Sequence, residues 1–285
     1  MARTLRLLMP QWQGGNNPAY ALGAKLLAMI APGSEKALLA EVPVEPFEGN
    51  PLPVEDGVVA RSILRRQLAS ATRIIEQHQP DRIIVFGGDC LVAQAPFMYL
   101  NQKYEGGLGV LWLDAHPDIS VPGMHGHEHA MVLGNLMGHG DPVFAAEVEA
   151  PVRPERVMYG GLREMTPREA EIVKKLGLRW AGPEALAQDS APVLAWIEEM
   201  RIRHLAVHFD LDVLDPKGFR SLLFAEPGGP VIHASSGTMT LAQIARVIRD
   251  VSQKTDVVGL SVAEYLPWDE INLRNAFDAM PIFHQ

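Results

Sequence analysis

The sequence of 285 residues contains a single cysteine, Cys90, so no disulfide can form within the chain. A chain of this kind suits a reducing compartment, and we expect a cytoplasmic protein. Long apolar runs are also missing, because no window approaches the ~18 uninterrupted apolar residues of a spanning helix. The apolar run near the N-terminus is too short for a signal peptide. We therefore expect no membrane insertion.

Positively charged residues are fewer than negatively charged ones. The chain has 25 Lys and Arg residues against 34 Asp and Glu residues, a net charge of −9, and its acidic residues are scattered rather than grouped. Such a surface repels nucleic acid and anionic lipid. We therefore expect neither nucleic acid nor a membrane as a partner.

Apolar residues, in contrast, are plentiful enough for a large core, at 47% of the chain. Nearly continuous apolar runs, typical of strands buried on both faces, alternate with segments of helical spacing. The predicted strands are 82–86, 108–113, 156–159, 204–209 and 257–262. The predicted helices are 57–78, 189–202 and 240–253, and long loops are expected at 41–57 and 215–239. This alternation predicts a single α/β domain over residues 1–285, doubly wound around a parallel sheet.

Polar side chains follow four of these strands directly. They are Cys90, the segment 114–118, the segment 210–212 and Glu264. In open parallel sheets, ligands bind outside the carboxyl ends of the strands. Four such strand ends together indicate a site rather than four unrelated turns.

Metal-ligand chemistry is concentrated in two of these segments. Asp114, His116 and Asp118 stand at i, i+2 and i+4, so an extended segment would point all three to one side. Asp210 and Asp212 repeat this spacing. A lone Asp-x-Asp often only caps a helix or a turn, but two such motifs at buried strand ends favour a metal site. Oxygen and imidazole ligands suit Mn²⁺, and two ions would offset four clustered carboxylates.

These motifs resemble those of the ureohydrolases, the family of arginase, agmatinase and formimidoylglutamase, over roughly residues 80–267. The matching segments, in the family's order, are Gly-Gly-Asp at 87–89, Asp-Ala-His-Pro-Asp at 114–118, Phe-Asp-Leu-Asp-Val-Leu-Asp-Pro at 209–216 and Val-Gly-Leu-Ser-Val-Ala-Glu at 258–264. The resemblance implies a three-layer α/β/α fold with a central, mostly parallel sheet. It also implies a homo-oligomer, commonly a trimer or a hexamer.

The resemblance further implies metal-dependent hydrolysis of a C–N bond in a small guanidino substrate, releasing urea or a urea analogue. Asp114 and Asp210 would bridge two Mn²⁺ ions, Asp118 would bind one ion, and His116 and Asp212 would bind the other. A hydroxide held between the ions would attack the guanidinium carbon.

Two further residues take catalytic roles from the resemblance. Glu264 matches the carboxylate that grips the guanidinium, an obvious charge complement. His129 matches the histidine that relays protons, since a pKa near neutrality suits that task. His127 is the second choice for the relay, and His125 and His139 are interpreted as surface histidines.

The sequence departs from the family pattern at Cys90, where the family has a histidine that binds the first metal. Cys90 is either a small buried apolar residue or a metal contact. As a thiolate ligand it would favour Zn²⁺ over Mn²⁺; otherwise one metal would be held weakly or be absent. A cysteine here also resembles a family branch that hydrolyses N-hydroxyguanidines.

Other functions remain open at this stage. The fold and metals could serve a related amide or amidine hydrolase, or a catalytically silent family member acting as a binding subunit. Cys90 could also be a nucleophile, although the five metal ligands would then have no role.

Overall fold

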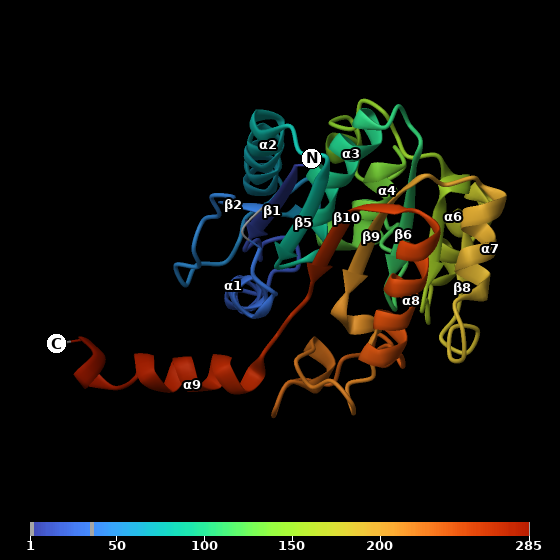
Figure 1. Cartoon of the computed structure of the whole chain (residues 1–285). Helices are drawn as coiled ribbons and strands as arrows, with labels where there is room; N and C mark the ends of the chain where they lie inside the picture. Colours follow the sequence, from blue (N-terminus) through green and yellow to red (C-terminus); the bar gives the residue numbers. More distant parts are fainter. Residues whose placement is uncertain (1–2, 35–36, 285) are drawn as a thin grey trace.

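The computed structural model describes residues 3–34 and 37–284, and its centre is a sheet of eight parallel strands (Figure 1). In spatial order the strands are β2 (Ala37–Glu41), β1 (Thr4–Met9), β5 (Arg82–Gly87), β10 (Asp256–Ala263), β9 (His204–Asp210), β6 (Leu108–Leu113), β7 (Val157–Gly160) and β8 (Arg179–Ala181). The chain crosses the sheet in both directions, as predicted for a doubly wound α/β fold.

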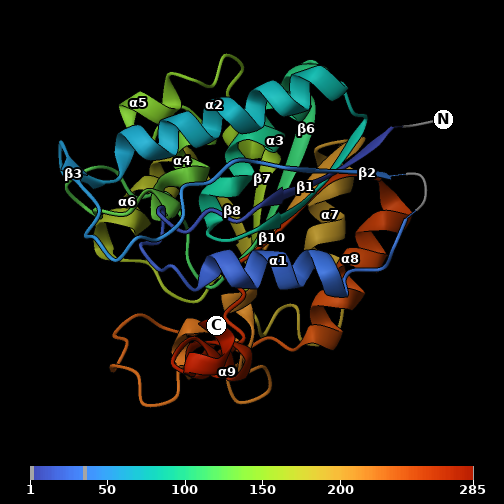
Figure 2. The same cartoon turned by 90° about the vertical axis from the view of Figure 1, so that its left-hand side faces the viewer.

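Helices cover both faces of this sheet, which makes three layers (Figure 2). One face packs against α2 (Arg61–His78), α3 (Gln94–Lys103), α4 (Val132–Leu136) and α6 (Pro167–Leu176). The other packs against α1 (Tyr20–Ile30), α7 (Ala191–Glu199) and α8 (Leu241–Lys254). The three-layer α/β/α prediction is confirmed.

The alternation of side chains along a strand divides the core between these faces. On β6, Val110 and Trp112 lie in the apolar cluster with α2 and α3, whereas Leu111 and Leu113 lie in the cluster with α7 and α8. Both sets are buried because both faces are covered, which is why the strand is a continuous apolar run.

The predicted strands are all present, but two of the predicted helices were too long. Helix 57–78 begins only at Arg61, because residues Val58–Val59 form the short strand β4, which pairs with β3 (Val54–Glu55), and Ala60 has a left-handed φ of 57°. Helix 189–202 is confined to Ala191–Glu199, and Arg201 beyond it has a φ of 49°. Helix 240–253 is confirmed as α8, with Thr240 in a capping box.

Several elements were not predicted. These are the strands β1, β2, β3, β4 and β8 and the helices α1, α3, α4, α5 (Pro142–Ala145), α6 and α9 (Trp268–Asp278). The segment 215–239 is mainly irregular, as predicted, with one short 3₁₀ turn at Leu223–Ala225. Among the described residues, no helix combines the length and the apolar character that crossing a membrane requires.

Candidate metal centre

The four strands that end in polar residues are neighbours in the sheet, in the order β5, β10, β9, β6. Their carboxyl ends therefore bring together Cys90, Glu264, Asp210 and Asp114, which come from segments up to 174 residues apart. All four side chains are buried. The predicted site residues thus meet at one edge of the sheet.

Asp114, His116 and Asp212 form one group, with a ligand atom of each within 4.8 Å of the others. The backbone N–H of His116 donates to Asp114 Oδ1 at 2.6 Å, and His116 Nδ1 lies 2.8 Å from Asp212 Oδ2. The segment 114–118 is not extended, because residues 114–116 bend and Asp118 has a φ of 46°. The bend itself brings His116 back toward Asp212.

A second group contains Cys90, Asp114, Asp210 and a further residue, His208. The Cys90 thiol donates to Asp210 Oδ2 at 2.9 Å. Asp210 is the last residue of β9 and also accepts from the backbone N–H of Asp212 at 2.7 Å. Cys90 therefore lies against a predicted metal ligand, not within a purely apolar pocket.

Asp118 is buried near both groups but belongs to neither. Its Oδ2 atom has no hydrogen-bond partner among the described residues. Burial raises the pKa of Asp118 to about 7, although the positive charges of His129 and His116 act in the opposite direction. The structure thus places this predicted ligand beside the centre with a free oxygen.

Glu264 and His129 lie together at the centre. His129 Nδ1 is 3.1 Å from Glu264 Oε1, and Cys90 Sγ is 3.8 Å from the same oxygen. Glu264 has a left-handed φ of 66°, and its backbone N–H donates to the Gly88 carbonyl at 2.7 Å. This turn directs the Glu264 carboxylate toward Cys90 and His129.

Negative charge dominates the electrostatics of the centre. Burial and the neighbouring carboxylates raise the pKa values of Asp114 and Asp210 well above the usual range, and the same two causes raise the pKa of the Cys90 thiol. For His116, burial opposes the charged form, but Asp212 outweighs it and raises the pKa to about 9. A buried acidic cluster of this kind is relieved by a cation.

Unpartnered polar atoms give an independent test of whether a metal fits. Among the described residues, His116 Nε2, Asp118 Oδ2 and His208 Nε2 are buried without a hydrogen bond. Buried polar atoms without partners are rare in proteins and call for an explanation such as a bound ion. Carboxylate oxygens, imidazole nitrogens and one sulfur are donors that divalent ions accept, so these residues fit a metal centre.

Three residues at the centre were not assigned roles from the sequence. His208 precedes Asp210 by two positions, so it shares a face of β9 with it, and this spacing was a usable signal. Asp89 accepts from the backbone N–H groups of Gly14 and Gly15 at 2.8 and 3.3 Å, which fixes the N-terminal loop to the site. Tyr20 is buried beside Glu264; burial and that carboxylate raise its pKa well above the usual range.

The second choice for the proton relay, His127, lies in a group of three histidines with His125 and His129. Its ring is half-buried, and burial together with the charge of His129 lowers its pKa to about 4. No contact links His127 to Glu264 in the described structure, unlike His129. The geometry favours His129 of the two.

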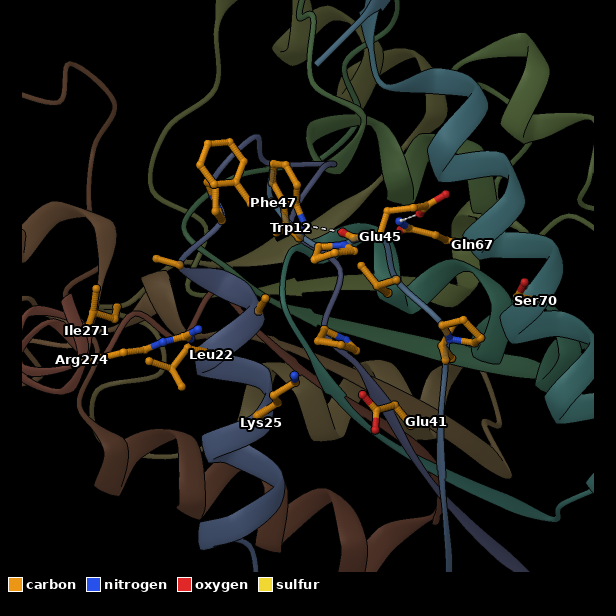
Figure 3. Close-up of a pocket in the computed structure, with 18 of the residues that line it drawn as sticks. Trp12, Leu22, Lys25, Glu41, Glu45, Phe47, Gln67, Ser70, Ile271 and Arg274 are labelled. Carbon is orange, nitrogen blue, oxygen red and sulfur yellow. Dashed lines mark hydrogen bonds between the residues drawn. The ribbon is translucent and has the colours of Figure 1, made fainter. Parts of the chain in front are cut away.

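A groove in the described structure lies away from this centre (Figure 3). It encloses about 1140 Å³ between α1, the segment 41–47, α2 and α9. Trp12, Phe47 and Ile271 supply apolar walls, and Lys25 and Arg274 supply charge. None of the predicted site residues lines it, so the chemistry belongs to the carboxyl edge and not to this groove.

The fold and this edge together define a three-layer α/β protein with a buried candidate metal centre at the ends of its central strands. The sequence model of the arginase family matches residues 36–281. The chain belongs to the arginase family.

Individual relatives agree with this assignment. The chain is 26% identical over 230 residues to a mitochondrial arginase of Medicago truncatula, covering 80% of this chain and 59% of that protein. It is 25% identical over 220 residues to human arginase-1, covering 73% of this chain and 65% of that protein. The chain therefore spans under two thirds of the length of these curated relatives.

Solved structures share the fold. An Entamoeba histolytica arginase in complex with L-ornithine has a TM-score of 0.79 at 17% identity, covering 94% of this chain and 92% of that chain. A Bacillus subtilis formimidoylglutamase has a TM-score of 0.67 at 12% identity, covering 94% and 80%. At these identities the similarity establishes the three-layer fold alone.

Proposed function

We propose that this protein is a metal-dependent hydrolase that cleaves a C–N bond of a guanidino compound and releases urea or a urea analogue. The observation that carries the proposal is the group of Asp114, Asp210 and Asp212, which are buried, with the half-buried His116 at the carboxyl edge of an arginase-family fold. Membership of this family makes a linear amidine the first substrate class to test.

The residues that would hold metal follow from the two groups. His116 and Asp212 would bind one ion, Cys90 and Asp118 would face the other, and Asp114 and Asp210 would lie between them. We propose Mn²⁺ as the ion, with Zn²⁺ an alternative where Cys90 is a ligand. When bound, such ions lower the pKa of coordinated water and supply positive charge beside the reacting carbon.

Glu264 is the group that would bind the substrate. Its carboxylate is 6% exposed and contacts His129. A guanidinium forms short, charge-assisted hydrogen bonds to a carboxylate. Substrate would therefore compete with His129 for Glu264 and displace the imidazole toward the leaving group.

His129 is then placed to move a proton. Burial disfavours its charged form, but the hydrogen bond and charge of Glu264 outweigh burial and raise its pKa to about 9. The ring therefore carries a proton at neutral pH. Cleavage of the C–N bond requires a proton on the departing amine, and a protonated His129 beside Glu264 would supply it.

Cys90 favours a second candidate, hydrolysis of an N-hydroxyguanidine. The thiol lies 2.9 Å from Asp210 and 3.8 Å from Glu264, where the family has a histidine. A changed ligand at this position alters the charge and affinity of the adjacent metal position. The product of this variant reaction would be hydroxyurea instead of urea.

A substrate panel with metal analysis tests both candidates. Purified protein loaded with Mn²⁺ or Zn²⁺ would be incubated with agmatine, L-arginine, other guanidino acids and N-hydroxyarginine, and urea and hydroxyurea would be measured. Asp210→Asn is expected to lose metal and to lower activity by at least about three orders of magnitude, as the loss of an essential catalytic member does.

Asp215→Asn is the matched control. Asp215 lies in the same motif, but its carboxylate only accepts from the backbone N–H of Lys217 at 2.9 Å. This variant should keep both metal and activity. Full activity of metal-free protein would overturn the proposal, and bound metal without turnover of any guanidino compound would favour an amide or amidine hydrolase or a silent binding subunit.

We also propose that the protein assembles as a homo-oligomer. Helix α9 and the residues that follow it expose large apolar side chains, among them Leu273 and Phe277 in the helix and Met280 after it. Exposed apolar side chains gathered on one element mark contact surfaces. Light scattering on the purified chain gives the molar mass directly, and a monomer over the whole concentration range would contradict this part.

A further inference from the structure

His208 occupies an unusual position directly beneath the metal centre. It lies on β9, on the same side of the sheet as Asp210, and its side chain is fully buried. Its ring stacks on the indole of Trp112 with centroids 3.8 Å apart, and Nδ1 is 2.7 Å from Ser261 Oγ. Trp112 and Ser261 come from the two strands that flank β9, at the same register as His208. The ring is therefore held by two contacts, one on its face and one at Nδ1.

The remaining nitrogen of His208 has no partner. Nε2 is buried and forms no hydrogen bond within the described residues. A histidine that donates Nδ1–H to an oxygen presents a lone pair at Nε2, which is the arrangement by which proteins orient a metal-binding imidazole. The Ser261 hydroxyl is an oxygen that can accept from Nδ1–H, and in that tautomer the ring is set to act as a ligand.

The neighbours of His208 complete a ligand set. One ligand atom each of Cys90, Asp114, His208 and Asp210 lies within 4.8 Å of the others. A sulfur and a nitrogen bound to one tetrahedral zinc ion lie about 3.6 Å apart, given bond lengths of about 2.3 and 2.0–2.1 Å. A contraction on the order of 1 Å would therefore close the four atoms around a single ion.

We propose that His208 is a metal ligand and that Cys90, Asp114, Asp210 and His208 form an inner, four-coordinate position that prefers Zn²⁺. This inference rests on the metal centre proposed above and assigns His208, in place of Asp118, as the fourth ligand of the ion that Cys90 faces. Thiolate and imidazole ligands shift preference toward Zn²⁺, whereas the outer position at His116 and Asp212 keeps the ligands that Mn²⁺ accepts. The centre would thus hold two different ions.

The neutral imidazole also explains how Cys90 can be tolerated there. Cys90, Asp114 and Asp210 as anions would place three negative charges around one ion. A neutral fourth ligand adds a donor without adding a charge. His208, two residues before Asp210 on β9, supplies this neutral ligand.

Cobalt titration of the full chain tests the proposal without any need for turnover. Metal-free wild-type protein should bind Co²⁺ with a near-ultraviolet thiolate-to-cobalt band and the strong visible absorption of a tetrahedral ion. Cys90→Ser should lose the thiolate band. His208→Ala should bind Co²⁺ at this position more than about 100-fold more weakly, since even outer partners of ligands change affinity by 10–100-fold.

The chain offers a matched control on the same strand. His204 begins β9 and stacks on Tyr104 with centroids 3.9 Å apart, at the end of the strand away from the centre. His204→Ala removes an equivalent stacked histidine and should leave both absorption and affinity unchanged. Ser261→Ala keeps the imidazole and removes only its orienting contact, and it should weaken binding by about 10–100-fold.

A direct measurement covers the case in which His208→Ala fails to fold. X-ray absorption of zinc-loaded His116→Ala protein should show one sulfur at about 2.3 Å together with imidazole scattering. Wild-type affinity and spectrum in His208→Ala, or no imidazole scattering, would overturn the role of His208 while leaving the hydrolase proposal intact. No metal binding by wild type would overturn both.

Discussion

Two buried polar regions of this molecule lie side by side and are built in opposite ways. At the metal centre, carboxylates outnumber cations, and oxygen and nitrogen atoms are left without partners. In the second region, Arg61 donates to Asp141 at 2.6 and 3.0 Å, and Asp141 also accepts from the backbone N–H of Val143. The centre requires a cation from outside, whereas the buried Asp141 carboxylate in the second region has its cation in Arg61.

The second region, which we call the Arg61 network, is a chain of contacts behind the centre. The Asp141 backbone N–H donates to Asn135 Oδ1 at 2.8 Å, and Asn135 donates to Gln94 and Glu128 at 3.1 and 2.7 Å. Glu128 precedes His129, so the two regions adjoin in the chain. The comparison teaches that burial of charge alone does not identify a site, whereas burial without compensation does.

The largest expected effect on stability comes from breaking the Arg61 network. Arg61→Ala leaves Asp141 buried without its cation, which typically costs about 3–5 kcal/mol of unfolding free energy. Arg65→Ala is the control, because Arg65 pairs with Glu147 at the surface and should cost under about 1 kcal/mol. Urea unfolding of both variants measures the difference, and equal costs would contradict the contrast drawn here.

Metal addition should act on the other region only. A divalent ion at about 100 times its Kd stabilises the folded state by about 2.7 kcal/mol. Thermal or urea unfolding with and without the ion should show this gain in wild type and in Arg61→Ala, but not in Asp210→Asn. A gain that survives in Asp210→Asn would place the ion elsewhere.

Removal of a carboxylate should have opposite signs in the two regions. Asp118→Asn removes a buried charge with a free oxygen, and in metal-free protein at pH 8 it should stabilise the fold by about 1–3 kcal/mol. Asp141→Asn should destabilise it, because Arg61 loses its partner. Chemical unfolding of chelator-treated proteins decides, and destabilisation by Asp118→Asn would show that its carboxylate is compensated.

The smallest effect concerns Glu128, at the junction of the two regions. Burial raises its pKa to about 8, above the unfolded value of about 4.3. Its contribution to stability is therefore complete below pH 4 and is lost as pH rises toward 8. Over the single pH unit from about pH 6 to about pH 7, the wild-type stability should fall relative to Glu128→Gln by at most about 1.4 kcal/mol. Parallel pH profiles for the two proteins would contradict this.

The sequence predicted the centre of the sheet well and its margins poorly. The strands β5, β6, β9 and β10 are apolar runs buried on both faces, which is a strong local signal. The apolar run that forms β1 was considered only as a signal peptide, for which it is too short. Strand β8 has three residues, too few to show a pattern. Helix α3 is buried around most of its surface, so it lacks the polar stripe that marks a surface helix.

The ligand residues could be predicted, but their grouping could not. Asp118 has a left-handed φ, and the residues next to it in the sequence do not predict this conformation. The contact of Cys90 with Asp210 depends on β10 being the only strand between β5 and β9, and strand order is a property of the whole sheet. The spacing of residues along one strand identifies candidate ligand residues. The ligands that would surround one ion, however, come from several strands, and local spacing does not show which ones meet.

Trp112 gives the centre a built-in optical signal. Its indole donates to Asp114 Oδ2 at 2.9 Å and stacks on His208, and the side chain is fully buried. A change of charge at Asp114 therefore acts directly on a fluorophore of fixed orientation, and a paramagnetic ion there would quench it. The occupancy of the centre can be followed in the native chain through the emission of one of its five tryptophans, without an attached label.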